Sequence, residues 1–297
     1  MSIAREELIG CVEAYLAALA ANEPSRAPVT ASARFTENGE ALKLSDGLWA
    51  TVTGRDTGGH CFTDPSTGQV AFFGVLSESQ SPIILGLRLK VEGGRASEVE
   101  SMVARPGGAL FRPESITGPR PAFEEVMAPS KRSSREELIA ITHSYFDGIE
   151  QRDGGIIRVD KDCARVENGM VTANRPADAA PLGGNEQMAR LGAMGVAEQI
   201  SAGIHGYISR VRDRRVLVVD EERGMTFGVF MFDHDGGDFI ELKDGTRREM
   251  PAFARTPSTA MIWEAFKVRG GLIRHVEAIG RILPYGAKPG WPTGVGA

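Results

Sequence analysis

The feature that most constrains the fold of this chain is a segment that occurs twice in its sequence. Residues 5–19 read REELIGCVEAYLAAL, and residues 135–149 read REELIAITHSYFDGI, an offset of 130 residues (135 − 5). The tripeptide Glu-Asn-Gly recurs at the same offset, at residues 37–39 and 167–169. Self-similarity over so long a period predicts a duplicated domain rather than a short-period solenoid.

A further match near the end of each copy shows that the copies differ in length. KVEGGRASEVE at residues 90–100 matches KVRGGLIRHVE at residues 267–277, an offset of 177 (267 − 90). The second copy has therefore gained 47 residues between its matching ends (177 − 130). The boundaries that we expect are residues 1–106 for the first domain, 107–133 for a Pro-, Gly- and Ser-rich linker, 134–285 for the second domain and 286–297 for an irregular tail.

Each copy has the same order of predicted elements. An amphipathic helix with 3.6-residue spacing of apolar side chains comes first, followed by a short strand that ends in Asn-Gly, a variable region with a helical piece, and a meander of long strands. A helix followed by a mostly antiparallel sheet belongs to the α+β class. We expect two tandem cone-shaped α+β barrels, each a curved sheet around its helix, with a ligand pocket inside. The expected long strands are 70–76, 83–91 and 96–103 in the first copy and 211–219, 226–232, 259–268 and 272–279 in the second.

Composition and charge exclude several classes of protein. With 42% hydrophobic and 25% charged residues the chain is of the globular type. Its net charge of −5 argues against nucleic acid as the main partner, because phosphate binding needs an excess of Lys and Arg. There is no apolar run near the ~20 residues that cross a bilayer, and no signal peptide pattern. The three widely spaced cysteines, Cys11, Cys61 and Cys163, favour a reducing cytoplasm and do not suggest a metal site.

The order of helix, Glu-Asn hairpin, middle helix and long strands resembles the nuclear transport factor 2-like (SnoaL-like, ketosteroid isomerase-like) superfamily. The resemblance covers nearly all of each copy. It implies a small hydrophobic substrate in the cone, with Tyr, Asp, His and Arg side chains on the wall that transfer protons. It also implies catalysis with neither a metal nor an organic cofactor. Because members often dimerise through their sheets, a tandem chain is expected to form an internal pseudo-dimer, and a homodimer is also open.

Two positions match the ketosteroid isomerase pattern of that superfamily. SYFDGIEQRD places Tyr145 where the pattern has a Tyr that donates to an oxyanion, in a context like YIELVD, and the first copy has Tyr15 there. The pattern's base is an acid in a VED context, whereas ARVENG has Asn168 at the acid and Glu167 one residue earlier. Since neighbours on a strand point to opposite faces, either Glu167 acts through a local bend or the base lies elsewhere. The resemblance thus makes Tyr145 and Glu167 catalytic candidates and Asn168 a substrate contact.

A comparison of the two copies singles out Glu264. At the offset of 177 this residue replaces Leu87, in a strand whose alternate residues are otherwise apolar in both copies. A carboxyl group in an apolar wall costs several kcal/mol unless it has a partner, and its pKa should rise towards the range useful for a general acid or base. The alternatives are a register shift by one residue or a buried ion pair with an arginine.

The next strand provides a second change, because His275 replaces Glu98. Histidine is the side chain whose ordinary pKa is closest to physiological pH, so His275 is a further catalytic candidate. Its strand face either lines the pocket or forms the surface between the copies. Glu100 and Glu277 occupy the same position in the two copies, which favours a structural role such as pairing with a helix N-terminus or with an arginine.

Four other residues are candidates for contacts with the substrate, each with a structural alternative. His234 ends an apolar strand, although its Asp-His-Asp-Gly-Gly context is also a hydrophilic turn. Arg210 begins a basic run that either stabilises an anion, forms an ion-paired strand face or holds the copies together. Tyr207 precedes this strand and supplies a second phenol. Trp263 belongs either to the core or to the pocket wall.

The sequence thus favours an enzyme that needs no cofactor and uses general acid–base catalysis on a small hydrophobic, aromatic, lignin-derived molecule. The expected reaction is a lyase reaction, either dehydration or release of formaldehyde. Motifs for hydride transfer, phosphoryl transfer and serine hydrolysis do not occur in the sequence. The alternatives are a non-catalytic module for small-molecule binding or assembly, and an isomerase or epoxide hydrolase.

Overall fold

The computed structural model describes residues 2–107, 110–176 and 186–292. Met1, residues 108–109 of the expected linker, residues 177–185 of the expected second domain and residues 293–297 of the expected tail lie outside the described residues. We call residues 5–104 the first half and residues 135–284 the second half. The domain boundaries given above stay a prediction.

The helices and strands of the first half follow the predicted order. They are α1 (Arg5–Ala20), a 3-10 helix (Pro24–Arg26), β1 (Val29–Glu37), β2 (Glu40–Ala41), α2 (Leu48–Thr51), β3 (Val52–Asp64), β4 (Gln69–Glu78), β5 (Ser81–Glu92) and β6 (Arg95–Ala104). A connecting segment with 3-10 helices at Pro113–Ser115 and Pro129–Lys131 and with α3 (Pro121–Glu124) leads to the second half.

The second half repeats this order with additional elements. Its elements are α4 (Arg135–Gln151), β7 (Val159–Glu167), β8 (Met170–Ala173), α5 (Glu186–Ala193), α6 (Val196–Ser201), β9 (Ile208–Asp220), β10 (Met225–His234), β11 (Phe239–Glu241), β12 (Arg247–Glu249), a 3-10 helix (Ala252–Ala254), β13 (Ser258–Arg269) and β14 (Leu272–Pro284).

The two halves contain six-stranded sheets with the same topology. The first sheet has the order β2-β1-β6-β5-β4-β3 and the second the order β8-β7-β14-β13-β10-β9. In each sheet one pair is parallel, β1 with β6 and β7 with β14, and the other neighbours are antiparallel. The prediction of barrels is wrong, because within the described residues the two outermost strands of each sheet do not pair with each other. The fold is α+β with two open, curved sheets.

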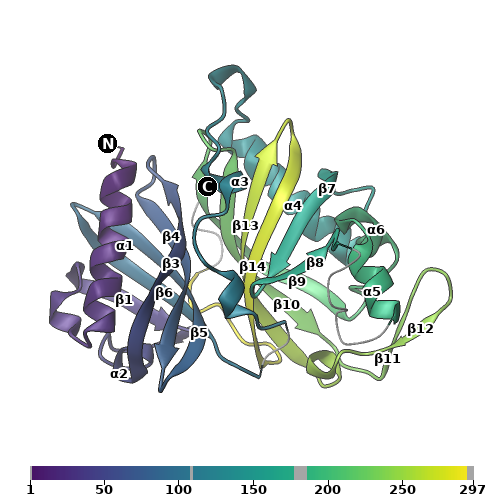
Figure 1. Ribbon diagram of the computed structural model, residues 1–297, viewed down its shortest axis with the longest axis horizontal. Coiled ribbons are helices and arrows are strands. Elements are labelled where there is room, and N and C mark those ends of the chain that lie inside the picture. Colours follow the sequence, from purple (N-terminus) through teal and green to yellow (C-terminus); the bar gives the residue numbers. More distant parts are fainter. Residues whose placement is uncertain (1, 108–109, 177–185, 293–297) are drawn as a thin grey trace.

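The sheets pack against each other and carry their helices on the outside (Figure 1). α1 covers the outer face of the first sheet, and α4, α5 and α6 cover the outer face of the second. Ser134 caps the N-terminus of α4, since its hydroxyl accepts the backbone N–H of Glu137 at 3.3 Å. Arg152, with a left-handed φ of 53°, caps the C-terminus. None of the helices among the described residues is long and apolar enough to cross a membrane.

Alternation along the strands gives each sheet one face for its helix and one for the other sheet. On β5, Leu85 packs towards α1, whereas Ile84 packs into the cluster between the sheets. Trp263 of β13 lies in that cluster and is fully buried. A Cβ atom at Gly86 would lie 2.8 Å from the Trp263 ring, so a glycine is what allows the sheets to approach this closely.

Ion pairs join the halves at the edge of this apolar contact. Arg215 donates to Glu100 through two hydrogen bonds of 2.9 and 3.1 Å, and both side chains are buried. The second carboxylate of the repeated pair, Glu277, accepts from Arg120 of the connecting segment at 2.8 Å. Both therefore pair with an arginine, as expected, and the basic run of β9 helps to hold the halves together.

The strand β3 and the β11–β12 hairpin were not predicted from the sequence. β3 contains TGRDTGGH, in which glycine and polar residues hide the alternation of a strand. It pairs with β4 through ladders that are interrupted at two irregular positions. The β11–β12 hairpin lies in the segment that the second copy gained, so the repeat gives no counterpart for it.

Replacing Arg215 by Ala should lower the free energy of unfolding by about 3 kcal/mol, because it leaves the buried carboxylate of Glu100 without its bidentate partner. The matched control is Arg26→Ala, which removes an exposed ion pair with Glu23 and should change stability by less than about 1 kcal/mol. Urea unfolding measures both. Equal effects of the two variants would show that the contact between the halves does not depend on this pair.

Candidate functional site

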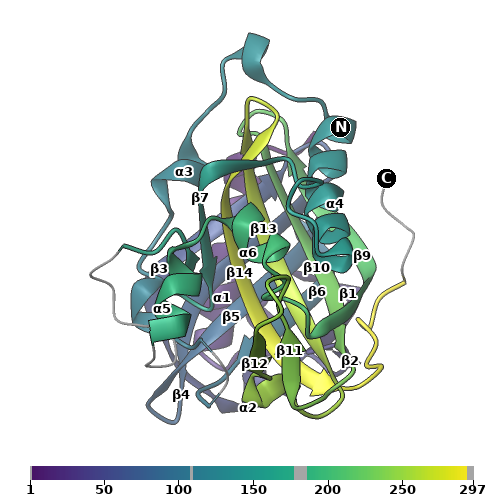
Figure 2. The same cartoon turned by 90° about the vertical axis from the view of Figure 1, so that its right-hand side faces the viewer.

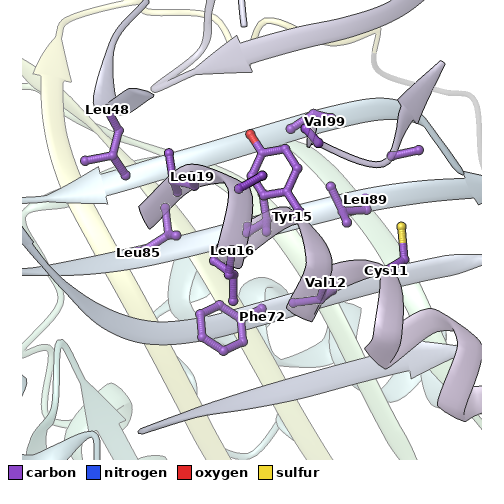
Figure 3. Close-up of a cluster of buried hydrophobic side chains, with 14 of the residues drawn as sticks. Cys11, Val12, Tyr15, Leu16, Leu19, Leu48, Phe72, Leu85, Leu89 and Val99 are labelled. Atoms are coloured by element: carbon purple, nitrogen blue, oxygen red, sulfur yellow. The ribbon is translucent and has the colours of Figure 1, made fainter. Parts of the chain in front are cut away.

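The two cones differ in what fills them. The second half encloses a cavity of about 520 Å³, whereas the corresponding space in the first half is about 10 Å³. In the first half Leu48 and Trp49 of α2 occupy the interior, and the Trp49 indole N–H donates to the Tyr15 hydroxyl at 2.9 Å. Figure 3 shows Leu48, Tyr15, Leu19 and Leu85 converging there. The first cone is therefore solid.

The longer connection before β9 explains why the second cone is open. In the first half α2 joins β2 to β3 directly and inserts into the cone. In the second half the chain between β8 and β9 runs from residue 174 to residue 207 and includes α5 and α6. Figure 2 shows these helices and the β11–β12 hairpin on the outer side of the second sheet, the side that also carries α4. His205 and Tyr207, at the end of this connection, line the cavity instead of filling it.

At the deep end of the cavity, Tyr145 of α4 lies beside Arg165 of β7. The Arg165 guanidinium donates to the Tyr145 hydroxyl oxygen at 3.5 Å, and its Nε lies 3.3 Å from Oε2 of Glu167. Because an arginine has only donors, the phenol oxygen is the acceptor and the phenolic hydrogen is left for another partner. Tyr145 and Glu167 both line the cavity.

Arg165 is held in place by a buried hydrogen-bond network. Its Nε donates to the Thr172 hydroxyl at 3.0 Å and its Nη2 to Oε1 of Gln199 at 2.5 Å. Gln199 of α6 in turn donates to the backbone carbonyls of Thr172 and Leu191 at 2.7 and 2.8 Å. Arg165 is a site residue that was not predicted from the sequence. The repeat contains the signal, since Phe35 stands at this position in the first copy.

Glu264 points into the cavity, as the alternation of its strand predicts. It is opposite Ala278 on β14, and Ala278 is opposite Glu167 on β7, so the two glutamates share one row of the sheet. Two strand spacings place their Cα atoms about 10 Å apart. Glu264 is 3% exposed, and its Oε2 has no hydrogen-bond partner among the described residues.

Burial and the negative charge of Glu167 raise the pKa of Glu264 to about 8, against the opposing effect of Arg165. At neutral pH the group is therefore largely a carboxylic acid. Neither alternative for Glu264 holds, because its side chain faces the cavity and has no ion pair with any described residue. A protonated carboxyl and a carboxylate consequently face the same space from one row of the sheet.

The phenols and imidazoles of the cavity are neutral at pH 7. Burial raises the pKa of Tyr145 well above its ordinary value and that of Tyr207 to about 12. It lowers the pKa of His234 to about 4, and the pKa of His205 is also well below the usual range. Nδ1 of the His234 imidazole lies 3.3 Å from the hydroxyl oxygen of Ser258. These groups can exchange hydrogen bonds with a ligand without bringing a charge to it.

Aromatic rings form one wall of the cavity. The Tyr207 ring lies 5.2 Å from His234 and 5.5 Å from Phe253, both in edge-to-face arrangements. Phe232 and Ile262 extend the apolar surface. A wall of this kind suits a flat, largely hydrophobic ligand.

The start of the connecting segment completes the mouth of the cavity. Arg105 and Phe111 line it, and Phe111 bridges to Gly169 beyond the end of β7. Asn168 also lines the mouth, where its side-chain amide exchanges hydrogen bonds of 2.9 and 3.3 Å with the backbone of Gly280. Residues that follow the first sheet in sequence thus form part of the rim of the cavity in the second cone.

Three predicted site residues lie outside the cavity lining, which is a correction. Trp263 precedes Glu264 on its strand, so it faces the first sheet instead of the cone. His275 also faces the contact between the halves, where its ring lies 5.2 Å from that of Phe123. Arg210 is exposed on β9. The structure brings together Tyr145, Glu167, Asn168, Tyr207, His234 and Glu264.

The arrangement offers proton transfer and hydrogen bonding to one bound molecule. A neutral acid, a carboxylate and a phenol backed by a guanidinium surround an apolar space, and these are the usual participants in general acid–base chemistry. Within the described residues, no group of three or more His, Cys, Asp or Glu side chains is placed to hold a metal ion.

Replacing Glu264 by Gln should change how stability depends on pH. The pKa of Glu264 is raised from 4.5 to about 8 in the folded state, so its contribution is greatest below about pH 4.5 and is lost as the pH rises towards 8. The free energy of unfolding of the wild type, relative to Glu264→Gln, should fall by roughly 2 kcal/mol between about pH 6 and pH 8. Urea titrations across this range measure the difference. A difference that stays constant with pH would contradict the burial argument.

No curated protein matches the chain. Among solved structures, PrhC from Penicillium brasilianum NBRC 6234 is similar with 15% identity over 50% of this chain and 83% of that chain, with a TM-score of 0.29. An LEH-like epoxide hydrolase from M. tuberculosis is 10% identical over 52% of this chain and 86% of that chain, with a TM-score of 0.29. AusH from Aspergillus nidulans is 11% identical over 50% and 86%, with a TM-score of 0.30.

One family model matches the second half of the chain. It is described as a domain of unknown function (DUF8021), and the match covers residues 131–280. This range includes α4, the whole second sheet up to Gly280 and the cavity residues Tyr145, Glu167 and Glu264. Since the match spans half of the chain, this protein belongs to the DUF8021 family.

Proposed function

We propose that the cavity of the second half is the active site of an enzyme that eliminates a small molecule from a hydrophobic, ring-bearing substrate by general acid–base catalysis. The observation that carries this proposal is Glu264, a buried carboxyl that faces an open cavity and whose Oε2 has no hydrogen-bond partner in the described part of the chain. The first half has Leu87 at this position, in a cone that is filled. A costly polar group beside an empty space is expected where function requires it.

Tyr145 would stabilise negative charge on the substrate. Arg165 donates to the phenol oxygen, so the phenolic hydrogen is available for an enolate or phenolate oxygen in the cavity. The positive charge behind the phenol strengthens it as a donor. Thr172 and Gln199 fix the guanidinium, and we therefore assign Arg165 a positioning role.

The two glutamates divide the proton transfers. Glu167, the ion-pair partner of Arg165, would take a proton from the carbon beside the stabilised oxygen. Glu264, protonated at neutral pH, would give its proton to the departing hydroxyl group, which leaves as water while a carbon–carbon double bond forms. In a formaldehyde-releasing reaction the same carboxylate takes the hydroxyl proton, the carbon–carbon bond breaks, and Glu264 protonates the carbanion. These transfers need only side chains and no cofactor.

Ligand binding without turnover is the second candidate. It is favoured by the aromatic wall of Tyr207, His234 and Phe253, which by itself provides a surface for a ring. In that case Glu264 and Tyr145 would act as fixed hydrogen-bond donors. Isomerisation would use the same groups, with Glu264 returning the proton to another carbon instead of to a leaving group.

We also propose that the halves are two copies of one nuclear transport factor 2-like domain that form an internal pseudo-dimer. The shared strand order and the corresponding register of the parallel pairs support this. Glu37 pairs with Ser101 as Glu167 pairs with Ala278, which are positions related by the two offsets of the repeat. Domain limits near residues 1–106 and 134–285 follow from this interpretation.

Incubation with a panel of aryl-substituted β-hydroxy ketones and lignin-type aryl-glycerol compounds, with detection of the alkene or of formaldehyde, tests the proposed reaction. On any substrate found, Glu264→Gln and Tyr145→Phe should each lower kcat by about 100-fold or more. The wild-type rate should fall above about pH 8, where Glu264 loses its proton, and Glu264→Gln should lack this decline.

His275→Gln is the matched control, because this residue lies on the second sheet but outside the cavity lining. It should leave kcat and the pH profile nearly unchanged. Full activity with an unaltered profile in Glu264→Gln would refute the assignment. Binding of panel compounds without any product would favour the second candidate.

A further inference from the structure

Arg281 on β14 is a cation at the cavity that forms no direct ion pair with a carboxylate of the described residues. It lines the cavity near the mouth, and its Nη1 donates to the backbone carbonyl of Val103 at 3.1 Å. It makes no ion pair within 4.0 Å with any carboxylate whose side chain the structure describes. Its neighbour Arg105 also lines the cavity but is satisfied by Glu78 through hydrogen bonds of 2.5 and 2.8 Å.

The nearby carboxylates are already engaged. Glu78 is occupied by Arg105, and Oε2 of Glu37 accepts the backbone N–H of Leu48 at 2.8 Å. Burial raises the pKa of Glu37, whereas burial and the proximity of Arg105 lower that of Arg281. An arginine nevertheless keeps its proton. Glu37 and Glu78 act on this charge only through space, so the partly buried guanidinium can still take an anion from a ligand as a direct partner.

The repeat shows that this cation distinguishes the open cone from the filled one. At the offset of 177, Arg281 corresponds to Ala104 in the first half. Arg165 and Glu264 differ from their counterparts in the same way, since Phe35 and Leu87 are apolar. All three exchanges occur around the cavity, so Arg281 belongs with the cavity and not with the general framework of the fold.

Arg281 is also well placed relative to the reacting groups. It follows Ala278, the residue between Glu264 and Glu167, by three positions on β14, so its side chain leaves the other face of the strand, towards the first sheet. It reaches the cavity lining beside Ala104 and Arg105, at the end of β6. Because Arg281, the aromatic wall and the two glutamates line one cavity, a molecule with one ring can contact both Arg281 and the row of the two glutamates.

We propose that the ligand of this cavity is an aromatic carboxylic acid, with its carboxylate on Arg281 at the mouth and the opposite end of its ring at Glu264 and Glu167. This inference rests on the proposed function for the identity of the reacting end. The carboxylate pairs with the free edge of the guanidinium, and a planar carboxylate matches that donor geometry. Substrates would thus be para-substituted aryl acids rather than neutral arenes.

The test compares two ligands of the same shape, 4-ethylbenzoate and 4-ethylbenzamide, by isothermal titration calorimetry at pH 7. The wild type should bind the carboxylate about 10- to 100-fold more tightly than the amide, because a hydrogen bond to a charged group is worth about 1.5–3 kcal/mol. Arg281→Gln should reduce this ratio to near one, and Arg281→Lys should keep part of it. Arg274→Gln, which removes a more exposed arginine of the same strand, should leave the ratio unchanged.

A wild-type ratio near one, or no detectable binding of either ligand at millimolar concentration, would overturn the proposal. An unchanged ratio in Arg281→Gln would overturn it as well. The same titration with Glu264→Gln separates this inference from the proposed reaction, because that variant should keep the carboxylate preference. A preserved preference without turnover of any para-substituted aryl acid would refute the reaction and leave the carboxylate site in place.

Discussion

The packing of the two sheets against each other is the constraint on which the rest of the structure depends. It uses one face of each sheet and leaves the other face to curve around a helix. Because side chains alternate along a strand, this contact determines which residues reach a cone. Trp263 packs against Gly86 in the contact, and its neighbour Glu264 is thereby directed into the cavity. The candidate site is a consequence of that register.

The same framework produces a filled cone in one half and an open one in the other. A short connection places Trp49 in the first cone, where the Tyr15 hydroxyl accepts a hydrogen bond from the indole N–H. A long connection keeps the second cone free, and Tyr145, which corresponds to Tyr15, meets Arg165 instead. A phenol that serves packing in one copy thus becomes a hydrogen-bond donor towards a cavity in the other. Little else in the topology has to change.

Much of this organisation follows from the sequence, for reasons that can be named. Helices α1 and α4 and the long strands have strong periodicity, and Glu264 stands out because the repeat supplies Leu87 for comparison. Arg165 on β7 would stand out in the same way, by comparison with Phe35 of the first copy. Trp263 and His275 were predicted at the site because periodicity shows which residues share a face of a strand. It does not show which of the two faces packs against the other sheet. The irregular β3 and the hairpin of the longer copy have no pattern that predicts them.

The filled half still contributes to the cavity. Its sheet covers the apolar face of the second sheet, including Phe227 and Trp263, which would otherwise be exposed to water at a cost of about 25 cal/mol per Å². The segment that leaves β6 then closes the mouth through Arg105 and Phe111. The buried Glu264, whose Oε2 has no hydrogen-bond partner among the described residues, destabilises the half that contains it. The extensive contact with the first half offsets this cost. The division of the chain into a solid half and an open half therefore allows one cone to carry polar groups that a single small domain would tolerate less well.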